Sequence, residues 1–183
     1  MGSPTPRSRT TGRWSSPEPP SRAFLTPELP GIGGAIKESP SDFVVEETPL
    51  YEPCGEGPHL YVRVTREGLS TQDVRRALAG AFGVAPDAVG YAGLKDKHAR
   101  CTQAFSVLTD LTPSEGLKRV EDLEGLEATA EPVRHRNKLK PGHLLGNRFR
   151  IRLRGLDVES EVALARAVAI SQACEPTGWP NYF

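Results

Sequence analysis

Three helix-forming segments, separated from one another by pairs of short strand-like runs, limit what this chain can fold into. The helical segments carry apolar residues at spacings of three and four, whereas the runs between them alternate apolar and polar residues or are short and apolar. The expected helices cover residues 70–82, 112–125 and 157–173, and the expected strands cover residues 43–47, 59–65, 89–92, 103–108, 128–133 and 148–154. This order predicts an α+β domain with a mostly antiparallel sheet and flanking helices.

The first helical segment has the clearest boundaries. Ser70 and Asp73 form a capping box at its start, and Gly83 ends it. Its expected buried stripe is Val74, Ala77, Leu78, Ala81 and Phe82. Thr112 and Glu115 mark the start of the second helical segment in the same way. The last segment has a weaker stripe, which we also expect to pack in the core: Val158, Val162, Ala165, Ala169 and Ala173.

A single carboxylate stands out in the loop between the two strands at 89–92 and 103–108. Asp96 is surrounded by Lys95, Lys97, His98 and Arg100. These neighbours favour the ionised carboxylate and would attract a polyanion. An ionised carboxylate on such a loop can act as a nucleophile, although a solvated, charged turn has the same pattern.

The segment 134–154 contains no acidic residue and eight Lys or Arg residues. The last four cations, Arg148, Arg150, Arg152 and Arg154, alternate with apolar residues. A strand here would bury an apolar face of Phe149, Ile151 and Leu153 and present a row of arginines on the other face. Such a row would repel itself unless an anion lay across it, so we expect these arginines to contact phosphate groups; a solvated sheet face is the alternative.

Composition excludes several classes of protein. Lys plus Arg and Asp plus Glu both total 23, so a polyanion would have to be bound by a local patch. The three widely spaced cysteines predict neither a disulfide framework nor a zinc site, and we expect no metal and a reducing, cytoplasmic location. No apolar run approaches the roughly 18 residues of a membrane span. Residues 1–30, rich in Ser, Pro and Arg, are predicted to be a disordered tail.

The string G-L-K-D-K-H-A, followed by Gln103 and F-S-V, resembles the signature of the TruD family of tRNA pseudouridine synthases. The resemblance implies that Asp96 is the catalytic nucleophile. Three further motifs match in the same order: I-K-E-S-P-S-D-F-V-V-E-E, the stretch with G-E-G-x-H, and H-R-N-K-L-K-P-G-H-L-L-G-N-R-F. They imply that Lys37 lies close to Asp96, that Phe43 packs on the target base, and that Asn147 and Phe149 contribute to the substrate pocket.

Two departures from the family pattern affect these expectations. The usual A-V-T-x-Q after the aspartate is A-R-C-T-Q here, so Arg100 and Cys101 could change the packing beneath Asp96. The chain also stops inside a motif that begins P-N-Y-F. We therefore expect residues 31–183 to be the N-terminal portion of a pseudouridine synthase catalytic domain, incomplete and with one sheet edge unpaired.

The resemblance implies isomerisation of a specific uridine of tRNA, position 13 in the bacterial members, to pseudouridine without metal or cofactor. A second hypothesis is a non-catalytic RNA-binding fragment that uses the basic face of residues 134–154. A carboxylate glycosidase is a third, less favoured class, because the loop around Asp96 offers no second carboxylate.

Overall fold

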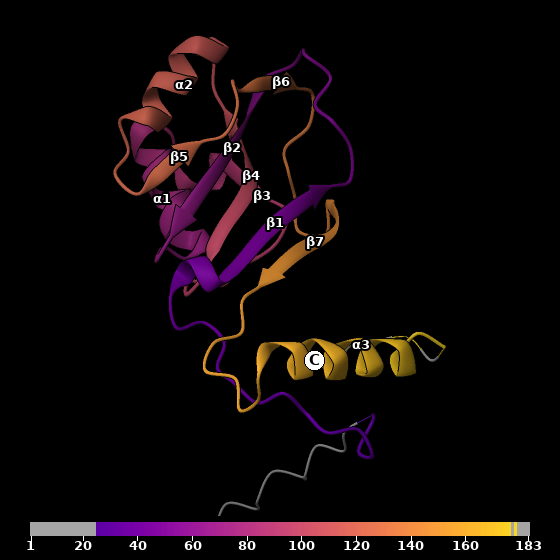
Figure 1. Ribbon diagram of the computed structural model, residues 1–183. Helices are drawn as coiled ribbons and strands as arrows, with labels where there is room; N and C mark the ends of the chain where they lie inside the picture. Colours follow the sequence, from indigo (N-terminus) through magenta and orange to yellow (C-terminus); the bar gives the residue numbers. More distant parts are fainter. Residues whose placement is uncertain (1–24, 177, 179–183) are drawn as a thin grey trace, which may run out of the picture. The chain divides into compact units, whose positions relative to one another are not determined.

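The computed structural model describes residues 25–176 and 178 (Figure 1). The chain divides into two compact units, residues 32–160 and residues 1–31 together with 161–183. The first unit contains the whole sheet. The predicted tail lies outside the described residues except for 25–30, which contain neither helix nor strand, and the P-N-Y-F motif lies outside them too.

Seven strands form one sheet: β1 (Phe43–Pro49), β2 (His59–Glu67), β3 (Val89–Tyr91), β4 (Arg100–Leu108), β5 (Leu126–Ala128), β6 (Val133–His135) and β7 (Leu144–Ile151). The main path runs β5-β2-β4-β1-β7, and Figure 1 shows β1 and β7 side by side at one end. Every pairing is antiparallel except that of β1 with β4. The predicted α+β class and mostly antiparallel sheet are confirmed.

Each of the two long central strands, β2 and β4, pairs along one of its edges with two shorter strands. On β4, β1 pairs with residues 100–102 and β3 pairs with residues 105–107. On β2, β5 pairs with residues 64–66 and β6 with residues 59–61. The ladder along β4 is therefore interrupted near Ala104, and its backbone N–H there needs another acceptor.

Two helices, α1 (Thr71–Phe82) and α2 (Pro113–Glu121), contribute to the same apolar core. Both begin with the predicted capping boxes, at Ser70 and Thr112, and α1 ends at Gly83 with φ +65°. The core joins the two helices to the central strands: Leu60, Val62, Val64, Val74, Leu78, Phe82, Phe105, Val107 and Val120. A Cβ on Gly116 would lie 2.3 Å from Leu60 Cδ2, so this glycine lets α2 approach β2 closely.

The prediction of one strand over residues 128–133 was wrong. The structure has two short strands there, β5 and β6, which pair with different parts of β2. Pro132 lies between them and has no N–H to donate to the ladder, which explains the interruption.

The prediction for residues 148–154 was wrong in both extent and burial. Strand β7 begins at Leu144 and ends at Ile151, so Arg152 and Arg154 lie beyond it. Phe149, Ile151 and Leu153 are exposed by 54%, 46% and 41%, so they do not form the buried face that was predicted. Within residues 25–176 and 178, the sheet path ends at β7, with β1 as its neighbour.

The last helix, α3 (Ser160–Cys174), starts three residues later than expected. The backbone N–H of Asp157 donates to the Ile32 carbonyl, so residue 157 belongs to the turn that precedes the helix. The expected stripe is also wrong: Val162, Ala165, Ala169 and Ala173 are exposed, while Ala163 and Cys174 are the buried members. No helix among the described residues is long and apolar enough to cross a membrane.

Candidate active site around Asp96

The loop between β3 and β4 holds Asp96 at the surface. Its ends are fixed by Ala92 and Ala99, which are both buried, whereas the Asp96 side chain is 53% exposed. The carboxylate is therefore accessible while the backbone on each side is anchored. This is the loop that the sequence predicted between two strands.

Lys37 reaches Asp96 from a segment far away in the sequence. Its Nζ lies 3.1 Å from Asp96 Oδ2 and 4.1 Å from the centre of the Phe43 ring. The ammonium group thus contacts the carboxylate and an aromatic face at once, an arrangement that fixes its position. The Lys37 side chain is 32% exposed, so solvent weakens the ion pair without removing its geometric effect.

Lys37 is also the one described non-glycine residue with a positive φ, at 61°. The left-handed conformation costs an L-residue about 1–2 kcal/mol. Such conformations cluster at functional sites, where the surrounding contacts hold them. Here the contacts with Asp96 and Phe43 explain why the conformation persists.

Strands β1 and β7 form an aromatic wall beside this pair. The register places Val45 opposite Phe149, and the Phe43 and Phe149 rings meet edge to face with centroids 5.9 Å apart. Phe43 is buried, whereas more than half of Phe149 is accessible. A hollow of about 360 Å³ joins this wall to the loop; it is lined by Val45, Leu94, Lys95, Asp96, Lys97, Asn147 and Phe149.

A buried polar network supports the loop from below. Arg66, 2% exposed, donates to the Asp96 carbonyl (3.3 Å) and to Thr71 Oγ1 (3.2 Å). Thr71 Oγ1 accepts the Lys95 N–H (2.9 Å) and donates to Gln103 Oε1, and Gln103 donates to the Gly93 carbonyl. The backbone around Asp96 is thereby tied to β2 through Arg66, to α1 through Thr71 and to β4 through Gln103.

The departure at residues 100 and 101 has a visible effect. Cys101 is buried beneath the loop and its thiol donates to the Asp96 carbonyl at 3.4 Å. Burial raises the pKa of this thiol, so it stays a neutral donor. Arg100 points elsewhere and forms ion pairs with Glu67 and Glu127, each at 3.0 Å.

Sequence analysis missed a buried ion pair next to the site. Lys95 Nζ and Glu47 Oε2 are 2.7 Å apart, and each side chain is 2% exposed. The other carboxylate oxygen, Oε1, accepts the Ala104 N–H at 3.3 Å, where the ladder of β4 is interrupted. A usable signal was present, since Glu47 lies two residues after Val45 and four after Phe43 and therefore shares their face of β1.

The arginine row lies on the other face of the sheet from this hollow. Alternation along β7 puts Asn147 and Phe149 on the side of Asp96, and Arg148 and Arg150 on the opposite side. Arg150 lies 3.6 Å from Glu46 of the neighbouring strand. The strand next to the row thus provides a carboxylate, so a bound polyanion is not required to relieve repulsion.

The two arginines beyond β7 converge on Asp42. Arg154 donates two bonds to the Asp42 carboxylate, both 2.8 Å, and Arg152 lies 3.8 Å from it. The bond from Arg154 is the main reason why the pKa of Asp42 is lowered to about 2. Arg154 thus connects the end of β7 to the start of β1.

Comparison with known proteins identifies the family. A profile described as tRNA pseudouridine synthase D (TruD) matches residues 21–183. The chain belongs to the TruD family. It is 47% identical over 161 residues to tRNA pseudouridine synthase D of Syntrophotalea carbinolica and 48% identical over 162 residues to that of Geobacter metallireducens.

The TruD relatives are much longer than this chain. The two alignments cover 87% and 88% of the chain but 38% of each relative. A crystal structure from Methanosarcina mazei that carries the same family name matches with a TM-score of 0.77 and 29% identity, over 88% of this chain and 36% of that one. The family resemblance read from the sequence and the fold class are confirmed.

Proposed function

We propose that this chain is the Asp96-bearing part of a tRNA pseudouridine synthase, which isomerises a uridine of tRNA to pseudouridine. The observation that carries the proposal is the contact of Lys37 with Asp96 beside the Phe43–Phe149 ring pair. This contact supports the proposal because Asp96 and Phe149 line one accessible hollow, with the Lys37 ammonium bonded to Asp96 and lying over the Phe43 ring. The position in tRNA, 13, is carried over from the family resemblance.

The target base must leave the helical stack, which costs a few kcal/mol. In the proposed mechanism the base packs on the aromatic wall. Phe43, to which the resemblance assigns this contact, is largely buried, so the more exposed Phe149 ring would present most of the stacking surface and Phe43 would support it. Asn147, which lines the same hollow, would hydrogen-bond the base. These contacts would offset the loss of stacking and hold the glycosidic bond close to Asp96.

Asp96 would then act on the N-glycosidic bond of the bound uridine. It either attacks C1′ or removes a sugar proton, the freed base rotates, and a new bond forms between C1′ and C5. The C5 proton is lost and N1 regains one, so the reaction is a balanced isomerisation. Lys37 would hold the Asp96 carboxylate in its orientation throughout.

Tritium release from tRNA labelled at C5 of uridine tests this function directly. We expect the chain to release tritium and Asp96→Ala to lower the rate on the order of a thousandfold or more, as loss of a nucleophile does. Asp110→Ala, which removes an exposed loop carboxylate, is the matched control and should keep the rate. Equal rates for the two variants would refute the role of Asp96.

Absence of release from the unaltered chain, with tRNA still bound, would favour the second candidate, an RNA-binding fragment without catalysis. The exposure of Phe149 and Ile151 supports this candidate, because the site face is open in the described residues. The two candidates share tRNA as the partner. Location in the cytoplasm stays a prediction.

The phosphate-contacting role is proposed for Arg148, Arg150 and Arg152. Arg154 is set apart, because its guanidinium is engaged by Asp42. The first two project from the face opposite to Asp96, so they would contact RNA flanking the target rather than the target itself. Arg148→Ala with Arg150→Ala should reduce the salt dependence of tRNA binding by about 0.7 to 0.9 in log–log slope per lost contact. An unchanged slope would exclude the role.

A further inference from the structure

A second hollow lies away from the Asp96 pocket, on the segment that follows β6. It has a volume of about 490 Å³ and is lined on one side by His135, Lys138, Lys140 and His143 and on the other by Tyr51. His59 also lines it, so three of the four histidines of the chain meet here. The pseudouridine synthase chemistry proposed above uses none of these residues.

The hollow is electropositive. Arg136, Lys138 and Lys140 line it together with a single carboxylate, Glu52, while Arg136 is also paired with Glu56 outside it. The pKa of His59 is lowered, first by burial and then by repulsion from Lys138 and His135. The buried His59 Nδ1 has no hydrogen-bond partner among the described residues. A concave surface with this balance of charge favours an anion.

The same hollow presents aromatic rings in a fixed arrangement. Tyr51 stacks on His135, with ring centroids 5.1 Å apart and planes inclined by 24°, and its hydroxyl bonds His143 Nδ1 at 2.9 Å. The Tyr61 hydroxyl donates to the Asn137 carbonyl at 2.9 Å, which ties this segment to β2. Their hydroxyl hydrogen bonds thus fix the orientation of the Tyr51 and Tyr61 rings. A base can stack on aromatic rings that are held in this way.

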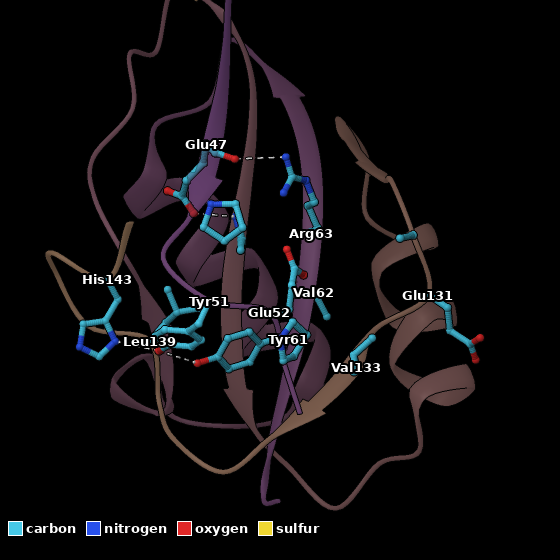
Figure 2. Close-up of a pocket in the computed structure, with 14 residues that line it drawn as sticks. Glu47, Tyr51, Glu52, Tyr61, Val62, Arg63, Glu131, Val133, Leu139 and His143 are labelled. Carbon is cyan, nitrogen blue, oxygen red and sulfur yellow. Dashed lines mark hydrogen bonds between the residues drawn. The ribbon is translucent and has the colours of Figure 1, made fainter. Parts of the chain in front are cut away.

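An apolar slot of about 150 Å³ opens beside the hollow and shares Tyr51, Glu52 and His143 with it. Figure 2 shows Tyr51 and Tyr61 close together on one side of the slot, with His143 at one end and Val133 at the other. The slot is lined mainly by apolar atoms, which suits a flat ring better than a phosphate.

The buried pair of Glu47 and Lys95 separates this slot from the Asp96 pocket. Glu47 lines the slot, Lys95 lines the pocket, and the two side chains touch at 2.7 Å. The slot is therefore a distinct site, but it is close enough to the Asp96 pocket to bind a different part of the same RNA.

We propose that the slot and the adjoining hollow form a second RNA subsite, which binds one unpaired nucleotide with its base in the slot and its phosphate at Lys138 and Lys140. The proposal rests on the proposed function in that RNA is the substrate. Lys138 and Lys140 in the hollow match the phosphate of a nucleotide, and the aromatic rings beside the slot match its base. Stacking of this kind tolerates any base.

Histidine ring protons report on the two sites separately. His135 and His143 line the proposed subsite, whereas His98 lies in the loop of Asp96. The probe is a short single-stranded oligoadenylate, which has no uridine to occupy the Asp96 pocket. On titration into the chain we expect the NMR signals of His135 and His143 to shift and that of His98 to stay in place.

Shifts confined to His98, or no shifts while full tRNA still binds, would overturn the subsite and leave the proposed function standing. Failure of both oligoadenylate and tRNA to bind would overturn the subsite and the proposed function together. Individual His→Gln variants assign the signals.

A charge-matched pair of variants gives a second test. Lys138→Ala with Lys140→Ala should weaken oligoadenylate binding about tenfold and lower its salt slope by about 0.7 per lost phosphate contact. Lys118→Ala with Arg119→Ala removes the same charge from exposed positions on α2 and should change neither. Equal effects of the two double variants would mean that oligoadenylate is attracted by positive charge anywhere on the surface, and this would refute the subsite.

Discussion

The central strand β2 and the edge strand β7 have the same alternating pattern in sequence but different surroundings in the fold. In β2, Leu60, Val62 and Val64 are at most 1% exposed, since they belong to the core shared with α1 and α2. In β7, Phe149 and Ile151 are about half exposed. Alternation shows which residues share a face of a strand, but burial requires a second layer, and that layer is a property of the whole fold.

The candidate site includes residues from both the covered and the exposed part of the sheet. Asp96 is tied through Arg66, Thr71 and Gln103 to the covered part of the sheet. Asn147 and Phe149 lie on the open strand. We therefore expect Asp96, the proposed nucleophile, to be held rigidly and the β7 residues of the site, Asn147 and Phe149, to be held more loosely.

The largest effect is expected for Glu47→Ala, at the boundary between the two regions. It leaves the Lys95 ammonium buried without its partner, which should lower the free energy of unfolding by about 3–5 kcal/mol. Urea denaturation measures the loss. In the double variant Glu47→Leu with Lys95→Met no charge is buried at this position, so part of the stability should return, although the Ala104 N–H loses its acceptor. A single variant that loses under about 1 kcal/mol would show that the pair does not stabilise the fold.

Next in size is a matched pair of truncations, Leu78→Ala and Phe149→Ala. Leu78 is fully buried between α1 and the sheet, so its loss should cost about 2–5 kcal/mol. Phe149 is the larger side chain, but it is half exposed, and its truncation should cost about 1 kcal/mol or less. Comparable losses in the free energy of unfolding, measured in urea, would mean that the exposed face of β7 is covered in solution and that β7 does not differ from β2 in burial.

The smallest effect is a pH dependence at the joint between β1 and β7. The pKa of Asp42 is about 2, below its usual 3.8, mainly because of its bond with Arg154. A lowered carboxylate pKa stabilises the fold above pH 3.8, and this contribution is lost as the pH falls from 3.8 towards 2.

Asp42→Asn should therefore flatten the dependence of the urea midpoint on pH in that window. The substitution should not abolish this pH dependence, because the pKa of Asp73 is also about 2, owing to its bonds with Ser70. Asp110→Asn, in an exposed loop, is the control. If Asp42→Asn left the pH dependence of the urea midpoint unchanged, Asp42 would not contribute to stability in acid.

The sequence predicted those features that depend on local signals. Ser70, Thr112 and Gly83 mark helix ends through their own backbone or side-chain chemistry, and each was located correctly. Motif resemblance placed Lys37 near Asp96, and the structure brings them into contact. Neither result required knowledge of distant parts of the chain beyond the order of the motifs.

Features that depend on several strands at once were not predictable in this way. The ion pair of Glu47 with Lys95 exists because β1 and β3 share one edge of β4, which no local pattern reveals. The carboxylates that accompany the arginine row come from β1 and from residue 42, about a hundred residues earlier. The positive φ of Lys37 likewise follows from contacts, since lysine has no preference for it.

The joining of β1 to β7 has a consequence for the order in which the molecule opens. Asp42 and Arg154 are 112 residues apart in sequence, so the aromatic wall is closed by one of the most distant pairings in the chain. A pairing that closes a long loop and buries little apolar surface is weakly protected against local opening. Amide hydrogens of β7 should therefore exchange faster than those of β2 and β4. The aromatic wall would then open transiently while Asp96 remained in place, so the hollow beside Asp96 could widen without unfolding of the core.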